Sequence, residues 1–285
     1  MPASAGQVVF SQTPLEQLNV TQDETEYLFY TTSVYVAPPA VLTVEGWLAN
    51  TYSVFLNGSL VASQYDCSHQ GGPQSYSFNL APNASGVANL TILSGSLGIH
   101  NGINNDQPAS AQEHKGIVGN VTLAGVDITG SGWTHHPFLA GEVLGVYTLA
   151  GGSSVAWTPV PGDGVNVPLT WFRTTFPAPS DQLQGSILVN MTGTTRGHMY
   201  LNGFDLGRYV VLVVSTLLAI FDSGAWSFNS YWTIEQDGVP VQQYYYIPRD
   251  LLLATNTLVL AEEVGAPSIT SLSIVLSTMV VPDSA

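Results

Sequence analysis

Two segments of the sequence combine the residue types that bind sugars. A sugar site sets a flat aromatic ring against the apolar face of the sugar and uses amide and carboxylate groups for its hydroxyls. The first segment is polar and rich in asparagine, and we expect it to contribute His100, Asn101, Asn104, Asn105 and Asp106. The second segment would contribute the aromatic side chains of Trp226, Phe228, Tyr231 and Trp232. The alternatives are a simple turn for the first segment and a hydrophobic flap packed on a neighbouring domain for the second.

Carboxylates that could hydrolyse a glycosidic bond are not paired in the sequence. Retaining glycosidases hold two carboxyl groups about 5 Å apart, and inverting ones about 6.5–9.5 Å apart. Glu262 and Glu263 are adjacent, so on a strand their side chains point to opposite faces. No spacing pairs the other candidates, which are Glu45, Glu113, Glu142 and Glu235. We therefore predict no catalytic residue in this chain, and expect solvated or turn-capping carboxylates.

No metal or cofactor is predicted either. His135 and His136 are neighbours, so on a strand one would face a site and the other the core. The single Cys67 excludes an intrachain disulfide and a thiolate cluster. There is no Gly-X-Ser-X-Gly motif and no glycine-rich phosphate loop before a helix.

The elements that must position these residues occur twice. Residues 52–61 read like residues 198–207, and each stretch contains a Leu-Asn-Gly sequence, with Asn57-Gly58 in the first and Asn202-Gly203 in the second. Such Asn-Gly pairs between apolar runs predict hairpins with type I′ turns. Matching runs precede both copies, and Asn89 and Asn256 open matching runs after them. The second copy holds about 22 extra residues after Arg208, which places an apolar and aromatic insertion at about 210–240. Arg208 itself is expected to form a buried or interdomain ion pair.

Short β-branched runs separated by turn residues predict an all-β protein. Strands are expected at 40–45, 53–56, 89–93, 119–123, 186–191 and 271–276. This pattern is typical of two tandem jelly-roll β-sandwiches. The expected organisation is a tail or edge strand at 1–25, a first domain at 26–148, a linker at 149–168 and a second domain at 169–285.

Composition excludes several partners. The chain has 285 residues, 20 acidic against 5 basic side chains and a net charge of -15. Phosphate backbones and anionic membrane surfaces would be repelled, so nucleic acid is not expected as a partner. The most apolar run, residues 210–221, is too short for a membrane span, which needs about 20 residues.

Six Asn-X-Ser/Thr sequons indicate a secretory history, and the expected glycosylation sites are Asn19, Asn57, Asn83, Asn89, Asn120 and Asn190. The first six residues have neither the basic nor the apolar region of a signal peptide. The expected location is nevertheless extracellular, or a lysosome-like or vacuole-like compartment. The alternative is a cytosolic protein with unused sequons.

Both copies resemble a known family. Residues 169–179, 197–209, 243–249 and 258–263 resemble the C-terminal part of β-galactosidases of glycoside hydrolase family 35, the plant members above all. Residues 27–33, 55–58, 93–98, 116–125 and 141–142 follow the same family. The resemblance implies galactose-binding-like jelly rolls that, in the family, follow a catalytic (β/α)₈ barrel with two glutamates. Such a barrel needs about 250 residues of alternating strand and helix, and no part of this chain matches it. Between Arg208 and Gln243 the chain departs from the family pattern.

The resemblance and the residues together predict a non-catalytic carbohydrate-binding or scaffold module, lectin-like, with galactose-containing or other glycans as partners. One alternative is a structural subunit of an extracellular coat, filament or complex, joined to other subunits through residues 210–232. Another is an accessory part of an active β-galactosidase whose barrel lies on a separate chain.

Overall fold

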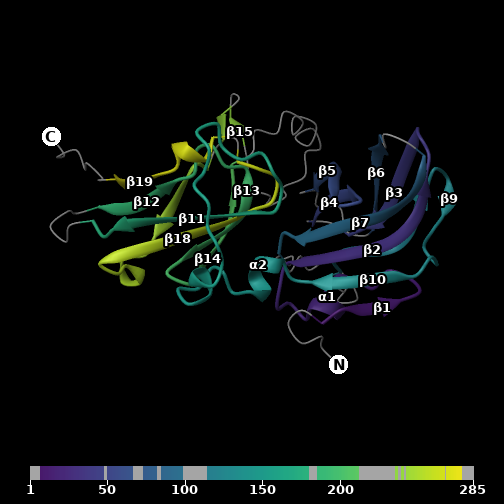
Figure 1. Cartoon of the computed structure of the whole chain (residues 1–285), viewed down its shortest axis with the longest axis horizontal. Helices are drawn as coiled ribbons and strands as arrows, with labels where there is room; N and C mark the ends of the chain where they lie inside the picture. The colour runs from purple at the N-terminus through teal and green to yellow at the C-terminus, as the bar shows by residue number, and fades with distance from the viewer. Residues whose placement is uncertain are drawn as a thin grey trace, which may run out of the picture. The chain divides into compact units, whose positions relative to one another are not determined.

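The fold is all-β, as predicted (Figure 1). The computed structural model describes residues 7–47, 50–66, 73–81, 85–98, 114–179, 185–211, 235–236, 239–240, 242–266 and 268–277. These residues divide between two compact units, Met1–Val143 and Leu144–Ala285. Each unit has its own cluster of buried hydrophobic side chains, so each has its own core.

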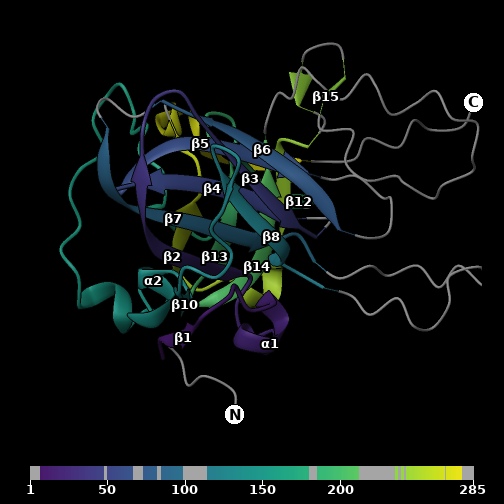
Figure 2. The same cartoon turned by 90° about the vertical axis from the view of Figure 1, so that its right-hand side faces the viewer.

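The first unit is a sandwich of two antiparallel sheets (Figure 2). The six-stranded sheet has the order β1 (Val9–Ser11), β10 (Trp133–Pro137), β2 (Tyr27–Val36), β7 (Gly86–Ser96), β4 (Asn50–Leu56) and β5 (Ser59–Asp66). The four-stranded sheet has the order β6 (Gln74–Leu80), β3 (Ala40–Gly46), β8 (Ile117–Leu123) and β9 (Val126–Asp127). The helices among the described residues of this unit are α1 (Gln17–Thr21) and α2 (Ala140–Val143). Burial alternates along β3 and β6, as expected where one sheet face covers a core.

The second unit repeats this strand order. Its four-stranded sheet has the order β11 (Thr170–Pro177), β18 (Thr255–Glu262), β13 (Arg196–Leu201) and β14 (Phe204–Val210). Its three-stranded sheet has the order β17 (Tyr244–Ile247), β12 (Ser186–Asn190) and β19 (Ser273–Ser277). A two-strand ribbon, β15 (Glu235–Gln236) with β16 (Val239–Pro240), lies between β14 and β17 in the chain. Within the part of this unit that the structure describes, single turns of 3-10 helix occur at Gly151–Ser153, Arg249–Leu251 and Ile269–Ser271.

The two units are equivalent strand by strand. β2, β7, β4 and β5 have the order of β11, β18, β13 and β14, and β6, β3 and β8 have the order of β17, β12 and β19. Both central hairpins contain a register shift at the same place, between Val54 and Phe55 in β4 and between Met199 and Tyr200 in β13. β-bulges tend to be kept among proteins of one fold. A bulge at the same place in both units therefore supports the internal repeat independently of the sequence.

Both Asn-Gly turns have the backbone that a type I′ hairpin requires. The φ angles are 49° and 81° at Asn57 and Gly58, and 52° and 88° at Asn202 and Gly203. Each asparagine also ties the turn to the next strand of its sheet. The Oδ1 atom of Asn57 accepts from the amide of Asn89 at 2.9 Å, and that of Asn202 accepts from the amide of Thr257 at 2.8 Å. The side chains at these two tips are therefore part of the fold.

Candidate functional site

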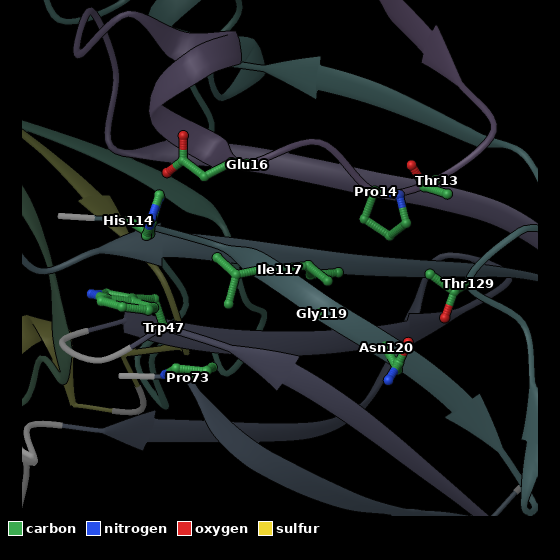
Figure 3. Close-up of a pocket in the computed structure, with 11 residues that line it drawn as sticks. Thr13, Pro14, Glu16, Trp47, Pro73, His114, Ile117, Gly119, Asn120 and Thr129 are labelled. Atoms are coloured by element: carbon green, nitrogen blue, oxygen red, sulfur yellow. The ribbon is translucent and has the colours of Figure 1, made fainter. Parts of the chain in front are cut away.

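A groove on the first unit runs along β8 and has a volume of about 550 Å³. Thr13, Pro14 and Glu16, which precede α1, lie along one side (Figure 3). Trp47 and Pro73 lie along the other side, and residues 117–120 of β8 form the floor between them. His114 and Thr129 complete the lining. A concave site of this size is in the range that holds a small ligand.

The aromatic side of the groove is Trp47, held rigidly at the end of β3. Its amide donates to the carbonyl oxygen of Gly116 at 3.0 Å and lies 3.1 Å from the hydroxyl of Tyr52. Its carbonyl oxygen accepts from the hydroxyl of Tyr76 at 3.1 Å. The indole makes an edge contact with the His114 ring at a centroid distance of 4.9 Å. Trp47 is half-buried, so part of its ring remains available to a ligand.

The acidic side of the groove is Glu16, the residue that caps α1. Its Oε2 accepts from the amide of Asn19 at 2.9 Å, as an N-cap carboxylate does. Its Oε1 accepts from the amide of Lys115 at 2.6 Å, which joins the α1 side of the groove to the start of β8. Each carboxylate oxygen has a second lone pair, so Glu16 retains capacity to accept a hydroxyl from a ligand.

The groove floor is shaped by a glycine. A Cβ atom at Gly119 would lie 2.2 Å from Oε2 of Glu45, whose carboxylate lies across this position. The same oxygen accepts from the amide of Asn120 at 2.8 Å. Asn120 is exposed and lines the groove, so its amide can both donate to and accept from a ligand.

The predicted sugar-binding residues stay a prediction, because none of them is among the described residues. His100, Asn101, Asn104, Asn105 and Asp106 lie outside the described residues, and so do Trp226, Phe228, Tyr231 and Trp232. Trp47, His114 and Glu16 were not predicted. The signal that could have found Trp47 is its place directly after a predicted strand and Gly46.

The sequons and the histidine pair are placed as follows. Asn19, Asn57, Asn89 and Asn120 are exposed, Asn190 is half-buried and Asn83 lies outside the described residues. Asn120 is therefore both a sequon and a groove residue. On β10, His135 is fully buried and His136 is exposed, the divergence expected of neighbours on a strand. Within the described residues, no group of three or more His, Cys, Asp or Glu side chains could hold a metal.

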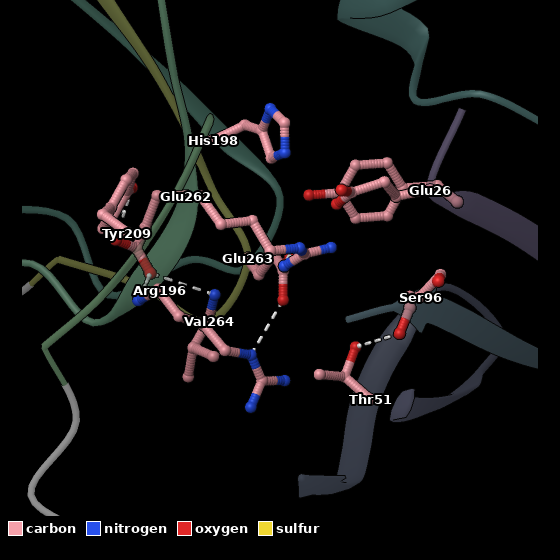
Figure 4. A network of polar contacts seen from close by, with 12 residues as sticks. Glu26, Thr51, Ser96, Arg196, His198, Tyr209, Glu262, Glu263 and Val264 are labelled. Atoms are coloured by element: carbon pink, nitrogen blue, oxygen red, sulfur yellow. Dashed lines mark hydrogen bonds and ion pairs between the residues drawn. The ribbon is translucent and has the colours of Figure 1, made fainter. Parts of the chain in front are cut away.

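The second unit contains a buried ionic network (Figure 4). Glu263 accepts from Nε of Arg196 at 2.8 Å and from Nη1 of Arg208 at 2.5 Å. Arg208, predicted to form an ion pair, thus shares one carboxylate with Arg196. The glutamate is 4% exposed, which differs from the solvated or turn-capping role expected from sequence. These side chains are at most 12% exposed, so removing one of the charges should be strongly destabilising.

Glu262 has a different role from its neighbour. It is fully buried, and it accepts from the Tyr209 hydroxyl at 3.0 Å and from the amides of Val264 and Gly265, each at 3.2 Å. It also accepts from the side chain of Thr195. Burial raises the pKa of Glu262, and the hydrogen bonds it accepts oppose that rise. Glu262 thus caps the turn after β18. Among the contacts described for Glu262, none is to a second carboxyl group, so no carboxyl pair for hydrolysis of a glycosidic bond is found there.

A third acid lies nearby on β14. Nδ1 of His198 lies 3.3 Å from Oδ1 of Asp205. Burial acts to raise the pKa of Asp205, but the bond to His198, the amide of Gly207 and the Arg208 charge together hold it below its usual range. The Arg208 charge that lowers the pKa of Asp205 belongs to the ionic network.

One known domain family matches part of this chain. Residues 169–257 match the family of the β-galactosidase galactose-binding domain. Over 271 residues the chain is 30% identical to Beta-galactosidase 8 of Arabidopsis thaliana, covering 88% of this chain and 30% of that protein. Over 275 residues it is 30% identical to Beta-galactosidase 11 of Oryza sativa subsp. japonica, covering 90% of this chain and 28% of that protein. The chain thus spans less than a third of the length of either relative.

The likeness to solved structures is slight. A GH2 β-galacturonidase from Eisenbergiella tayi bound to galacturonate shares 12% identity, over 67% of this chain and 27% of that one, with a TM-score of 0.20. Across the described residues, no helix has the length and apolar character that a membrane crossing requires. Over almost its whole length the chain is similar to a part of plant β-galactosidases, and its residues 169–257 match the β-galactosidase galactose-binding domain.

Proposed function

We propose that this chain is a non-catalytic carbohydrate-binding module that binds a neutral, galactose-containing oligosaccharide in the groove along β8. The observation that carries the proposal is the pairing of an aromatic ring, Trp47, with the carboxylate of Glu16 and the amide of Asn120 around one concavity. A ring for the apolar sugar face and acceptors and donors for the hydroxyls are the two requirements of sugar recognition. Residues 169–257 of the second unit match a galactose-binding domain, and the first unit repeats that unit's strand order, which supports galactose as the sugar.

Charge supports a neutral ligand. Among the described lining residues, Glu16 is the one side chain that carries a full charge at neutral pH, and it is negative. The chain as a whole has a net charge of -15. A uronic acid or sulfated sugar would be repelled both locally and by the overall field. The groove therefore favours neutral sugars over acidic ones.

One variant of this function is an accessory role. The relatives are more than three times as long as the segment they share with this chain. In this variant the module is an accessory part of a β-galactosidase, with the catalytic barrel on a separate chain. In that case the groove would hold part of the substrate near a catalytic domain, and co-purification with a barrel-containing chain would show it.

The test is isothermal titration of lactose and of β-linked galactobiose into the purified chain. Trp47→Ala should weaken binding by about tenfold or more, since a lost sugar-stacking ring is worth about 1.4 kcal/mol. Tyr35→Ala removes an aromatic side chain that is 67% exposed and outside the groove, and should leave binding unchanged. The dimer of galacturonic acid should bind more weakly than galactobiose. Equal losses in both variants, or no binding of either sugar to the wild type, would contradict the proposal.

A further inference from the structure

The α1 side of the groove depends on one residue, Leu15. Its neighbours Pro14 and Glu16 line the groove, and Leu15 itself packs against the core of the first unit. Two buried side chains hold its main chain. The amide of Leu15 donates to Nε2 of His135 at 2.9 Å, and its carbonyl oxygen accepts from the hydroxyl of Tyr30 at 3.0 Å. The position of this side of the groove is therefore set by His135 and Tyr30.

The hydrogen bonds of His135 fix its protonation state. Because Nε2 accepts from an amide, that nitrogen carries no proton in the structure. The proton of the neutral ring is then on Nδ1, which lies 3.1 Å from the carbonyl oxygen of Val9 in β1. A doubly protonated ring would place an N–H against the amide of Leu15 and break that bond. It would also place a charge in a site where the side chain is fully buried.

The groups around His135 do not favour its charged form. The ring of Tyr30 contacts it edge-on at a centroid distance of 5.2 Å, and burial holds the pKa of Tyr30 well above its usual range, so this residue stays neutral. The adjacent His136 is exposed and adds a repulsive charge when protonated. β1 and α1 have no ionisable side chain. Glu16, next to Leu15, accepts from two main-chain amides.

Burial lowers the pKa of His135 below its ordinary value of 6.5. The hydrogen bond to Val9 opposes this lowering, and the nearby His136 adds to it.

Tyr30 connects Leu15 to the groove floor. Its hydroxyl, which donates to the carbonyl oxygen of Leu15, also accepts from the amide of Ile117 at 3.3 Å. Loss of the Leu15 bond would therefore disturb one side of the groove while the Trp47 side keeps its own anchors, Tyr52 and Tyr76.

We propose that His135 is a positioning residue for the groove, which holds its oligosaccharide while the imidazole is neutral and releases it when the imidazole is protonated. The ligand part of this inference rests on the proposed function. The structural part, in which protonation frees the amide of Leu15, does not.

The first experiment measures binding of β-linked galactobiose between pH 8 and pH 5.5. Wild-type affinity should fall by up to about tenfold for each pH unit below the pKa of His135. In His135→Gln the side-chain oxygen can still accept from Leu15 but takes up no proton, so affinity should stay level across this range. His136→Gln removes the exposed neighbour and its repulsive charge, so it should keep the wild-type slope and move the midpoint of the profile to slightly higher pH. His114→Gln should also keep the wild-type slope of affinity against pH. That result would assign the slope to His135 and not to the histidine that lines the groove.

The second experiment needs no ligand. Nuclear magnetic resonance follows the amide of Leu15 and the ring of His135 in the full-length chain as the pH falls. Both should titrate together, and exchange of the Leu15 amide with solvent should accelerate in the same range. If galactobiose never binds but these signals titrate together, the proposed function fails and the positioning role stands. A Leu15 amide that is unaffected by His135 protonation, or an unchanged slope in His135→Gln, would overturn the inference.

Discussion

The main-chain amide of Trp47 lies 3.1 Å from the hydroxyl of Tyr52, a fully buried residue five positions further along the chain. The same hydroxyl lies 2.9 Å from the carbonyl oxygen of Gly116, at the start of the groove floor. Space for this contact comes from Gly46, where a Cβ atom would lie 2.1 Å from the Tyr52 oxygen. One buried hydroxyl thus connects the aromatic side of the groove to its floor.

Tyr52→Phe tests this connection. The ring and its packing are kept, but the buried hydrogen bonds are lost, which should cost about 1–3 kcal/mol of stability. Galactobiose affinity should fall several-fold, because Trp47 is no longer fixed in one position. Tyr35→Phe removes an exposed hydroxyl and serves as the matched control. Calorimetric titration and thermal unfolding check both effects. Normal affinity in Tyr52→Phe would show that the Tyr52 hydroxyl has no part in binding.

Gly203→Val should destabilise the second unit. The φ of Gly203 is 88°, a conformation that a β-branched residue resists, and an added Cβ would meet ordinary contacts at 3.5 Å or more. Backbone strain rather than crowding therefore sets the cost, about 1 kcal/mol or more. Gly162→Val is the control, because a Cβ there meets open space at a φ outside the left-handed region. Equal melting temperatures for the two variants would contradict the type I′ turn.

Acid should destabilise the first unit through His135. Its pKa in the folded chain lies below the ordinary value of 6.5, so between the two pKa values the unfolded chain binds more protons. The free energy of unfolding then rises with pH in this window. The stability that the neutral His135 contributes is fully present above about pH 6.5 and is lost as the pH falls below that value. Calorimetric unfolding at pH 7.5, 6.5 and 5.5 should show this loss in the wild type and a smaller one in His135→Gln. A loss of the same size in both would assign the acid sensitivity to other groups.

The chain should not hydrolyse nitrophenyl β-galactoside. Its similarity is to a galactose-binding domain, and its described residues form antiparallel sheets rather than the strand–helix alternation of a catalytic barrel. An assay with repurified protein should match the buffer blank. Turnover that survives repurification and disappears on replacing a glutamate of this chain would show that the chain is an enzyme.

Much of the fold could be predicted from sequence because strand signals are local. The six expected strands all lie within or overlap observed ones, among them β3, β8 and β12. Alternating apolar residues and Asn-Gly turns depend on the residue itself and its immediate neighbours. Residues 155–157, in the connecting segment, form no strand, and Nε1 of Trp157 donates to the carbonyl oxygen of Gly152 at 2.6 Å.

The repeat was recognised from sequence, but one equivalence was wrong by a residue. The sequence pattern equates Asn89 with Asn256. In the structure, the amide of Asn57 donates to the carbonyl of Asn89, and the amide of Asn202 donates to that of Thr257. Asn256 instead caps a turn, accepting from the amide of Leu253 at 2.8 Å. Both asparagines lie in strands, and only the pairing register shows that Asn89 corresponds to Thr257.

The groove could not be predicted, because its residues come from segments far apart in the chain. Glu16, Trp47, His114 and Asn120 are brought together by the order of β3 and β8 and by α1. Individually, each has an ordinary structural explanation. The predicted insertion at about 210–240 lies mostly outside the described residues and stays a prediction.

The most direct test of the central claim is a nuclear magnetic resonance titration of the isotope-labelled chain with β-linked galactobiose. If the groove binds the sugar, the indole N–H of Trp47, the side-chain amide of Asn120 and the amides of residues 117–120 should shift together with one dissociation constant. The exposed side of the Asn202-Gly203 hairpin in the second unit should not shift. Shifts confined to residues outside the groove, or no shifts at saturating sugar, would contradict the account.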